Sequence, residues 1–509
     1  MAISTNQSYL YRPSYQSPAY NPIIFTCYSQ YYTYEDMRYI FDVYVNIGST
    51  MTKVARIRQR PNPNGYGMLD ISSIAQSYID YSNEDAPITN GETTIDYING
   101  KVYEDNNYLS KKMYIKVGEE YKVSGVLYTY NGLGNDSGNI GDPEYTMYSS
   151  YDSRDLPIFV WGCSLEDHQQ QYHLSNPTDA GVIGSNPWIK DGGANKIFDR
   201  IEGTSYPLSF SSLNLTMYAY DKAVLSYLNY SPDEAEKDRV IYGFRFVFKD
   251  DSGTILSTQD VPVTASKGGN QRLTPTSSFT DLEDPDYHMI HVLASPNDLV
   301  TALGISAIVK FQEGYSIEIT GYDHGAEGTF TFVDPITKTT KITIKESCDN
   351  PLYERVRLSW LNTLGGRDYL NFEVKNEKTI EFTEDTMYSE QMKWSQGPSP
   401  VDTISGPYTI NRLGILGGVK PYNKMIKTTY SIESDWLDED QIELLNGLQS
   451  SPQVMAYIHD SNNTFSDYYP YTVKLKNKSY VTKNYKQNKL IQGKFEIELV
   501  MPMKIQNTI

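Results

Sequence analysis

Apolar and polar residues alternate in short stretches along most of the chain. Within residues 355–372, Val356, Leu358 and Trp360 alternate with polar residues, a glycine pair follows, and the alternation then resumes. A period of two residues is typical of strands that bury one face. We therefore predict a mainly β, multi-domain chain built of β-sandwich (immunoglobulin-like) modules. The other segments with this pattern are 39–45, 54–58, 112–117, 121–128, 244–249, 254–256, 307–311, 315–320, 328–333, 378–382 and 495–500.

A few short helices complete the predicted secondary structure. Asp70 and Ser295 stand where a helix N-cap is expected, and Pro296 suits the first helical position. Asp438 opens a third helix with a capping-box pattern, and Gly447 suits the left-handed position that follows a last turn. The predicted helices cover residues 70–80, 296–303 and 438–446.

Changes of pattern divide the chain into an arm, a linker and four β domains. Residues 266–286 carry Gly, Ser, Thr, Pro and acids without periodicity, which favours a linker. Residues 244–256 have the order strand, glycine-containing turn and strand, a hairpin common in sandwiches. The predicted parts are an extended arm at 1–22, a β domain with one helix at 23–150, a sandwich-like domain at 151–265, the linker at 266–286, a β domain at 287–385 and a C-terminal β domain with one helix at 386–509.

The first 22 residues are rich in Ser, Tyr, Pro and Asn and show no period. Proline keeps such a segment extended, and tyrosine offers a large contact area with few rotatable bonds. We expect this arm to become ordered against a neighbouring subunit, and a frayed terminus is the alternative. Its predicted interface residues are Tyr9, Tyr11, Arg12, Tyr15 and Tyr20.

Tyrosine is the unusual residue of the composition, with 45 copies against 16 Phe and 5 Trp. Its ring packs while its hydroxyl still finds a partner, which suits either half-buried strands or a wet assembly surface. The net charge of −19 argues against a surface that wraps nucleic acid, since neutralising phosphates requires clustered Lys and Arg. This charge is compatible with a channel through which DNA slides without specific contact.

Cysteine usage and hydropathy bear on the compartment. Cys27, Cys163 and Cys348 are far apart and odd in number, so they predict neither a disulfide framework nor a metal knuckle. This suits assembly in a reducing bacterial cytoplasm. The N-terminus lacks the apolar core of a secretory signal, and no run of about eighteen apolar residues occurs, so we expect no membrane anchor.

Catalytic and metal-binding motifs are weak throughout the sequence. The nucleophile elbow, the Walker A loop and the H-E-x-x-H pattern are all missing. His288 and His291 would converge on a metal only in a helix, whereas a strand is expected there. Residues 131–142 lack the ligand order of a calcium loop, and 63 acidic residues make pairs such as Glu433 and Asp435 frequent. We predict no catalytic residue, no bound metal, no cofactor and no enzymatic activity.

Gly365 and Gly366 lie between two predicted strands, where a ligand-holding loop and a plain turn are the alternatives. Glycine supplies the positive φ angles that tight connections need. A phosphate cradle would require a helix after the glycines, whereas the strand pattern resumes there. We therefore predict a structural turn at Gly365 and Gly366.

Three segments together resemble one group of proteins: SPAYNPI at 17–23, the PNPNGYG loop at 61–67 with the helix that follows it, and WLNTLGGRD at 360–368. The chain resembles virion structural proteins of crAss-like phages, the short-tailed phages of gut Bacteroides. Within that group it is most similar to the neck or tail proteins that form the ring or hub around the DNA-ejection channel. The resemblance implies a homo-oligomer in the virion tail or neck, contacts with other phage tail and neck proteins, proximity to channel DNA, and no cofactor.

Two other functions are alternatives. A tail fibre-type adhesin or depolymerase would bind host surface polysaccharide through Tyr and Trp clefts. Coiled-coil heptads or a β-helix repeat would indicate such a protein, and the sequence shows neither. A secreted bacterial surface protein is disfavoured by the missing signal peptide.

Overall fold

The structure is a computed structural model of the chain, and it is mainly β with three short helices among the residues it describes. The predicted fold class is confirmed. The described residues are 9–11, 13, 16–29, 31–47, 50–79, 102–104, 110–130, 158–164, 198–199, 204–228, 241, 243–262, 289–308, 310–324, 332–345, 355–389, 394–395, 411–412, 418–437, 442–458, 470–476, 491–499 and 503–505.

The chain forms two compact units. The first comprises residues 1–350, 359–370 and 440–453, and the second comprises residues 351–358, 371–439 and 454–509. The predicted linker at 266–286 lies outside the described residues.

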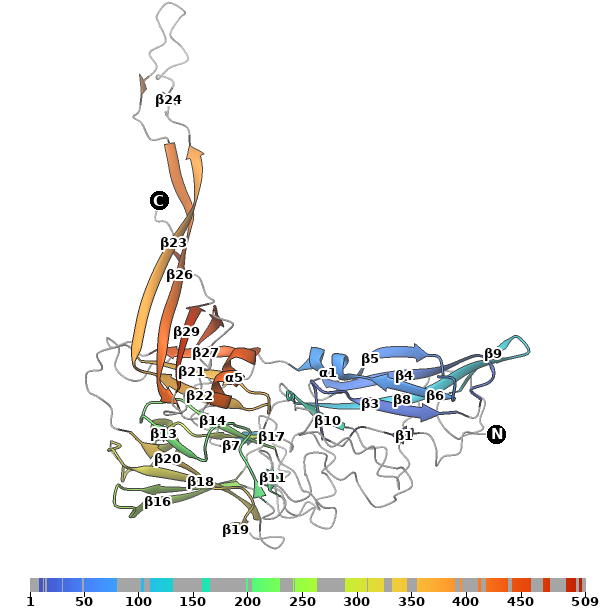
Figure 1. The fold of residues 1–509 in the computed structure, drawn as a ribbon, viewed down its shortest axis with the longest axis horizontal. Coiled ribbons are helices and arrows are strands. Elements are labelled where there is room, and N and C mark those ends of the chain that lie inside the picture. Colours follow the sequence, from blue (N-terminus) through green and yellow to red (C-terminus); the bar gives the residue numbers. More distant parts are fainter. Residues whose placement is uncertain are drawn as a thin grey trace, which may run out of the picture. The chain divides into compact units, whose positions relative to one another are not determined.

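A first sandwich in the first unit packs a three-stranded sheet against a six-stranded one (Figure 1). Its core is built from alternate residues of the strands, among them Phe25, Tyr39, Phe41, Val43 and Val117. The smaller sheet has the order β1 (Tyr9–Tyr11), β3 (Ile24–Tyr28), β6 (Tyr66–Asp70), and the larger has the order β2 (Gln16–Pro18), β10 (Ile158–Trp161), β8 (Ser110–Val123), β4 (Glu35–Ile47), β5 (Thr50–Gln59), with β9 (Val126–Tyr130) also paired to β8.

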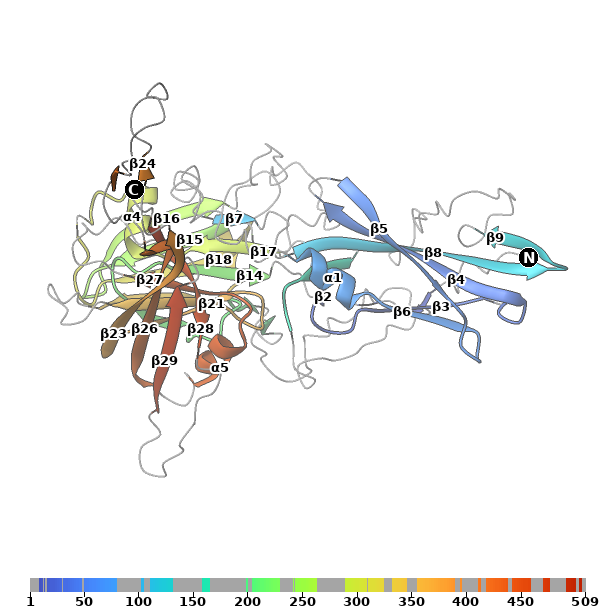
Figure 2. The ribbon, with the colours of Figure 1, turned by 90° about the horizontal axis from the view of Figure 1, so that it is seen from above.

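Helix α1 (Ser72–Tyr78) follows β6 directly and lies beside β2 (Figure 2). Asp70 ends β6, and its Oδ1 accepts hydrogen bonds from the backbone N–H groups of Ser72, at 2.9 Å, and Ile23, at 3.0 Å. The N-cap position is Ile71 and has no side-chain cap, so the prediction of Asp70 as the cap of a helix over 70–80 is wrong; Asp70 instead bonds to the backbone of Ile23 and of the first helical residue. Ala75 buries the apolar face of the helix, as the 3.6-residue period predicts.

A second sandwich in the same unit contains strands from both sides of the predicted linker. Strands β15 and β18 pair directly, so residues 243–262 and 316–344 share one sheet and one core. The predicted separation of 151–265 from 287–385 is therefore not seen in the pairing. The larger sheet has the order β13 (Asn214–Met217), β20 (Thr340–Ile344), β18 (Ser316–His324), β15 (Gly243–Lys249), β16 (Ile255–Pro262), with β19 (Phe332–Pro335) also paired to β18. The smaller sheet has the order β14 (Val224–Leu228), β17 (Met289–Leu293), β7 (Val102–Glu104). A separate pair is formed by β11 (Phe198–Asp199) and β12 (Thr204–Ser205).

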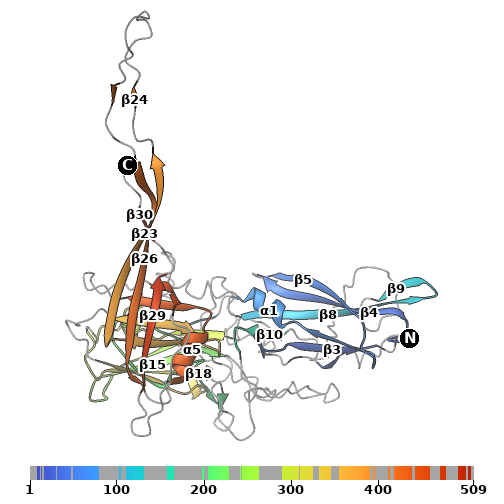
Figure 3. The same ribbon diagram turned by 45° about the horizontal axis from the view of Figure 1, so that its top comes forward.

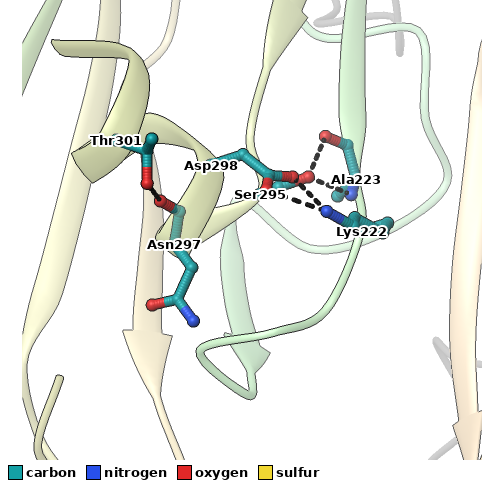
Figure 4. Close-up of polar contacts among 6 residues, drawn as sticks. All are labelled: Lys222, Ala223, Ser295, Asn297, Asp298 and Thr301. Atoms are coloured by element: carbon teal, nitrogen blue, oxygen red, sulfur yellow. Dashed lines mark hydrogen bonds and ion pairs between the residues drawn. The ribbon is translucent and has the colours of Figure 1, made fainter. Parts of the chain in front are cut away.

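Helix α4 (Pro296–Leu303) spans the predicted range and closes on Gly304, whose φ of 63° is left-handed. Ser295 precedes the helix, but its side chain does not cap it. Its Oγ accepts a hydrogen bond from the Ala223 N–H at 2.9 Å and donates one to the Ala223 carbonyl oxygen at 3.3 Å (Figure 4). Asp298 in the first turn pairs with Lys222 at 2.6 Å. The helix start is thus fastened to the segment before β14.

An eight-stranded sheet dominates the second unit, and its strands β21 and β22 run on in sequence into residues of the first unit. The sheet has the order β22 (Arg367–Phe372), β21 (Val356–Leu361), β27 (Val454–Ile458), β28 (Pro470–Leu475), β29 (Ile491–Leu499), β26 (Gly418–Leu437), β23 (Lys375–Ser389), with β30 (Met503–Ile505) on β26; β24 (Trp394–Ser395) and β25 (Asn411–Arg412) pair with each other.

Two strand predictions differ from the structure. Residues 307–308 are not a strand; Ile308 and Phe311 enter the core of the second sandwich from a loop, which produces the same alternation. Strand β8 runs unbroken to Val123, so the hairpin turns at Ser124 and Gly125, both with positive φ.

Helix α5 (Ile442–Ser450) differs from its prediction at both ends. It starts four residues later than predicted, and Asp438 lies outside the described residues. Gly447 lies inside the helix, where an added Cβ would be 3.1 Å from Nε1 of Trp360. The glycine therefore allows the helix to approach a buried indole and does not terminate it.

Candidate functional site

The predicted turn at Gly365 and Gly366 connects β21 to β22 and is organised by Asn362. Oδ1 of Asn362 accepts hydrogen bonds from the N–H groups of Leu364, at 3.0 Å, and Gly366, at 3.1 Å. The Asn362 N–H in turn donates to the Gly366 carbonyl oxygen at 2.9 Å. Gly365 has a φ of +89°, as the turn prediction requires, whereas Gly366 is not among the glycines with positive φ.

Both glycines lie in close contact with segments far away in the sequence. A Cβ on Gly365 would be 2.8 Å from Cδ1 of Trp161, and one on Gly366 would be 2.0 Å from the carbonyl oxygen of Leu208. Nε1 of Trp161 donates to the Leu364 carbonyl oxygen at 3.1 Å, and Nδ2 of Asn362 donates to the Leu208 carbonyl oxygen at 2.9 Å. The turn therefore ties the last residue of β10 and the segment between β12 and β13 to the connection between β21 and β22.

Arg367 and Asp368 follow the turn and point to opposite sides of β22. Arg367 donates to Ser359 Oγ at 3.1 Å and to Gln453 Oε1 at 2.6 Å. Asp368 is fully buried and accepts hydrogen bonds from Ser209 Oγ and from the Phe210 N–H. Burial raises the pKa of the Asp368 carboxyl to about 6, and its hydrogen bonds oppose that shift. These contacts hold the turn against distant segments of the same unit, and a purely structural role of the turn stays a prediction.

Part of the predicted arm lies in the chain's own sheets. Tyr9 and Tyr11 belong to β1 and face Cys27 and Thr26 of β3. Strand β2 pairs in parallel with β10, and the N–H of the half-exposed Tyr20 donates to the Cys163 carbonyl oxygen at 3.1 Å. Arg12 and Tyr15 lie outside the described residues. Docking of this arm on a neighbouring subunit stays a prediction.

A group of tyrosines at the turn end of β8 and β9 was not located by sequence reasoning. Tyr34 stacks on Tyr121 with ring centroids 5.0 Å apart and planes 18° apart, and Tyr31 contacts both rings. Tyr128 of β9 stacks on the other side of the group, 6.1 Å from Tyr121. The YYTY stretch at 31–34 and the tyrosines at 121 and 128 were visible as sequence signals, but their convergence depends on the β4–β8 pairing.

The turn of the β8–β9 hairpin adds apolar side chains next to these rings. Val126 and Leu127 are about half exposed, and Val123 and Tyr128 are more than a third exposed. We call Tyr31, Tyr34, Tyr121, Tyr128, Val123, Val126 and Leu127 the tyrosine tip. Stacked rings beside exposed aliphatic groups can bind flat or apolar partner surfaces, and the tip contains no carboxylate, imidazole or thiol for acid–base or nucleophilic chemistry.

The titratable residues with shifted pKa values are scattered in the described part of the chain. Glu119 on β8 is buried, and that burial raises its carboxyl pKa to about 7. Cys27 and Cys163 are buried free thiols whose pKa values burial raises. His291 is buried with Nδ1 2.9 Å from Ser226 Oγ, and His288 lies outside the described residues.

Neither a metal centre nor a membrane span emerges from the described residues. Among them, no three His, Cys, Asp or Glu side chains converge as metal ligands would. None of the described helices has the length and apolar character needed to cross a bilayer.

Comparison with known proteins gives no relative. The chain matches no family model, and no curated protein and no solved structure matches it significantly.

Proposed function

We propose that the protein is a structural component of a bacteriophage neck or tail, part of a ring or hub around the DNA-ejection channel. It acts by binding copies of itself and other tail or neck proteins. It is assembled in the bacterial cytoplasm and then resides in the virion. In this role it needs no cofactor and catalyses no reaction.

The observation that carries this proposal is the tyrosine tip. An assembly surface combines aromatic anchors with aliphatic groups in a patch that water reaches in the free subunit. Val126, Leu127 and Tyr128 form such a patch beside stacked tyrosines at the end of a sandwich. The same side chains would be costly to expose in a chain that works alone.

The proposal is tested by the mass of the purified chain and by its location. At micromolar concentration we expect a mass that is a multiple of the 57.9 kDa chain, and antibodies against the chain should label the neck or tail of the virions that encode it. The variant Leu127→Asp should reduce incorporation into particles, while Met68→Asp, which changes an equally exposed apolar residue on β6, should not. A monomeric chain that is absent from particles would contradict the proposal.

A second function shares the tyrosine tip as its support. The exposed rings of Tyr34 and Tyr128 also provide flat faces on which sugar rings can lie, as a tail fibre-type adhesin that binds surface polysaccharide requires, whereas Tyr121 is buried. Two results together would favour the adhesin. The purified chain would bind host polysaccharide and lose that binding in the Tyr34→Ala variant, and the chain would not be found inside the virion. Assembly without polysaccharide binding would favour the ring or hub.

A further inference from the structure

We propose that the outer edge of β23 pairs with β23 of a second copy, antiparallel, about a two-fold axis at Ile380. This inference rests on the proposed function, because it names one surface through which self-assembly takes place.

Strand β23 is the last strand of its sheet. It pairs with β26 along its whole length, from Lys375 opposite Glu433 to Ser389 opposite Gly418. Along its other edge it pairs with no strand among the described residues. Figures 1 and 3 show β23 and β26 continuing beyond β29, where β30 pairs with β26 over residues 424–426 before the two strands run on. A long edge strand without proline presents a row of unpaired backbone groups, which is a template for another strand.

Exposure along the strand agrees with an open ribbon. Every residue from 377 to 382 is exposed, so both faces of β23 are open over this stretch. Ile380 is 46% and Phe382 is 68% exposed, although both belong to a strand. Native edge strands that stay free usually carry charge, proline or a bulge; β23 carries charge at Glu377, Lys378 and Glu381 but apolar side chains at the exposed positions 380 and 382.

The exposed apolar residues continue a face that is buried further along the same ribbon. Alternate residues of β23 share a face, and so do the residues opposite them on β26. On this face Lys378 lies opposite Tyr430, and Asn376 lies opposite Ile432. Tyr430 and Ile432 are buried, whereas Ile380 and Phe382 are not. The apolar stripe thus extends past the part of the sheet that covers it.

The charge order of β23 identifies the second copy as the occupant. The first half of the strand carries Lys375, Glu377 and Lys378 and is basic on balance, and the second half carries only acids, Glu381, Glu384 and Asp385. An antiparallel pairing of two copies brings the basic half of each against the acidic half of the other. Strands of opposite charge order are self-complementary in this orientation, as a two-fold interface requires.

The register follows from the same charges. A two-fold antiparallel pair has one residue directly opposite its own copy. With Ile380 at the axis, Lys375 lies opposite the partner's Asp385 and Lys378 lies opposite the partner's Phe382. Moving the axis to 377, 378, 379, 381, 383 or 384 places like charges opposite each other, and moving it to 382 removes every opposite-charge pair. Among axes from 377 to 385, only the one at Ile380 aligns opposite charges without aligning like ones; an axis at 376 would also place Lys375 opposite Glu377, but it would pair only three residues of each strand.

Cysteine scanning tests both the contact and its register. Residues directly opposite in an antiparallel pair have Cβ atoms about 4.5–5.5 Å apart, close to disulfide reach, whereas the two copies of residue 382 would be displaced by four positions, roughly 13 Å along the strand. Under mild oxidation Ile380→Cys should form a covalent dimer in high yield. Phe382→Cys, on the same face, and Ile255→Cys, an equally exposed isoleucine on the edge strand β16, should not. The wild-type chain, oxidised in the same way, shows how much covalent dimer its own cysteines form.

Charge substitutions test the same pairing in solution. Ile380→Lys places two ammonium groups at the axis and should weaken self-association on the order of tenfold, while Ile255→Lys should leave it unchanged. Lys375→Glu should also weaken it, and adding Asp385→Lys should restore it, because the reversed charges again face each other. Circular dichroism of each variant checks that the ribbon is folded.

The outcomes separate this inference from the proposed function. If the wild type is oligomeric, Ile380→Lys does not change its mass and Ile380→Cys gives no covalent dimer, the β23 pairing is overturned and the proposed function stands. Crosslinking at 382 in place of 380 overturns the register. A wild type that is monomeric at micromolar concentration overturns both. Crosslinks from Ile380→Cys to a different virion protein, with none between copies, show that another strand occupies the edge and overturn the pairing of two copies.

Discussion

Gly366 lies against Leu208, 158 residues earlier in the chain, so closely that a Cβ on the glycine would be 2.0 Å from the leucine carbonyl oxygen and 2.9 Å from the leucine Cβ. Real Cβ atoms do not approach backbone oxygens to this distance, so either the turn or the Leu208 segment would have to move. The turn between β21 and β22 thus fits its neighbours only because it lacks a side chain there.

Replacement of Gly366 by alanine should therefore lower the free energy of unfolding by about 3 kcal/mol or more, the range of buried steric conflicts. The matched control is Gly253→Ala in the β15–β16 turn. Gly253 has a φ of +85° but no atom within 4 Å of an added Cβ, so only backbone strain of about 1 kcal/mol applies. Urea titrations measure both changes. Equal small losses would show that the Leu208 contact is not tight.

The turn illustrates how far the sequence can predict this site. Two glycines between alternating segments predict a hairpin, and β21 and β22 are found there. The pattern assigned positive φ to the pair, whereas only Gly365 has it. The role of Gly366 depends on Leu208, and no local pattern indicates which distant backbone a turn will touch.

Local sequence patterns do not show which distant segments come into contact, and this also explains the other differences between prediction and structure. Alternation predicts β15 and β29 because each buries one face of its sheet, and it predicts β4 although the centre of that strand is buried on both faces. It fails at 307–311, where loop residues supply the buried side chains. The tyrosine tip combines residues 31–34 with 121 and 128, and its assembly depends on strand register that composition does not contain.

Deletion of residues 2–22 should destabilise the first sandwich. The deletion removes β1 and β2 and the buried side chains of Ser17 and Ala19, and it exposes the edge of β10. We expect the melting transition of this sandwich to fall by several degrees or to disappear. Deletion of residues 2–8, which leaves β1 and β2 in place, is the control and should leave the transition in place. A full-stability chain lacking residues 2–22 would show that β1 and β2 contribute little within the chain, as an arm that docks only on a neighbour predicts.

Asp42 forms the most buried ion pair of the first sandwich. Its carboxylate accepts from Arg56 Nε at 2.7 Å and Nη2 at 2.8 Å, and Lys53 lies 3.0 Å away. Burial of the side chain, which is 1% exposed, raises its pKa, but the hydrogen bonds and charges of Arg56 and Lys53 outweigh burial, so the pKa is lowered. A lowered carboxyl pKa contributes stability above the ordinary value of 3.8, and that stability is lost as the pH falls through the folded value.

Asp42→Asn should therefore lower the free energy of unfolding by on the order of 1–3 kcal/mol at pH 7, and by progressively less as the pH falls below about 4. The matched control is Asp260→Asn. Asp260 makes the same two-bond pair with Arg245 across β15 and β16, but it is 43% exposed. Solvent screens that pair, so we expect a loss of less than about 1 kcal/mol. Denaturant titrations at pH 7 and pH 3.5 measure both. Equal losses for the two variants would show that burial does not strengthen the Asp42 pair.

Glu119 is the opposite case, a buried carboxyl with one oxygen that has no hydrogen-bond partner among the described residues. Burial raises its pKa from 4.5 to about 7, and the hydrogen bond with Ser29 only partly offsets this. Between pH 4.5 and about pH 7, the Glu119 carboxyl holds a proton in the folded chain that it has released in the unfolded chain. Unfolding is therefore favoured increasingly as the pH rises through this window, by about 1.4 kcal/mol per pH unit at most.

Glu119→Gln removes the ionisation while keeping the shape of the side chain. We expect the variant to be more stable than the wild type at pH 8, by on the order of 1–3 kcal/mol, and to differ little from it at pH 4.5. Glu35→Gln, at an exposed position on β4, is the control and should change stability at neither pH. Urea titrations at the two pH values give the four differences. A Glu119→Gln variant that is less stable than the wild type at pH 8 would show that the ionised carboxylate is well solvated, and the buried placement of Glu119 would then be wrong.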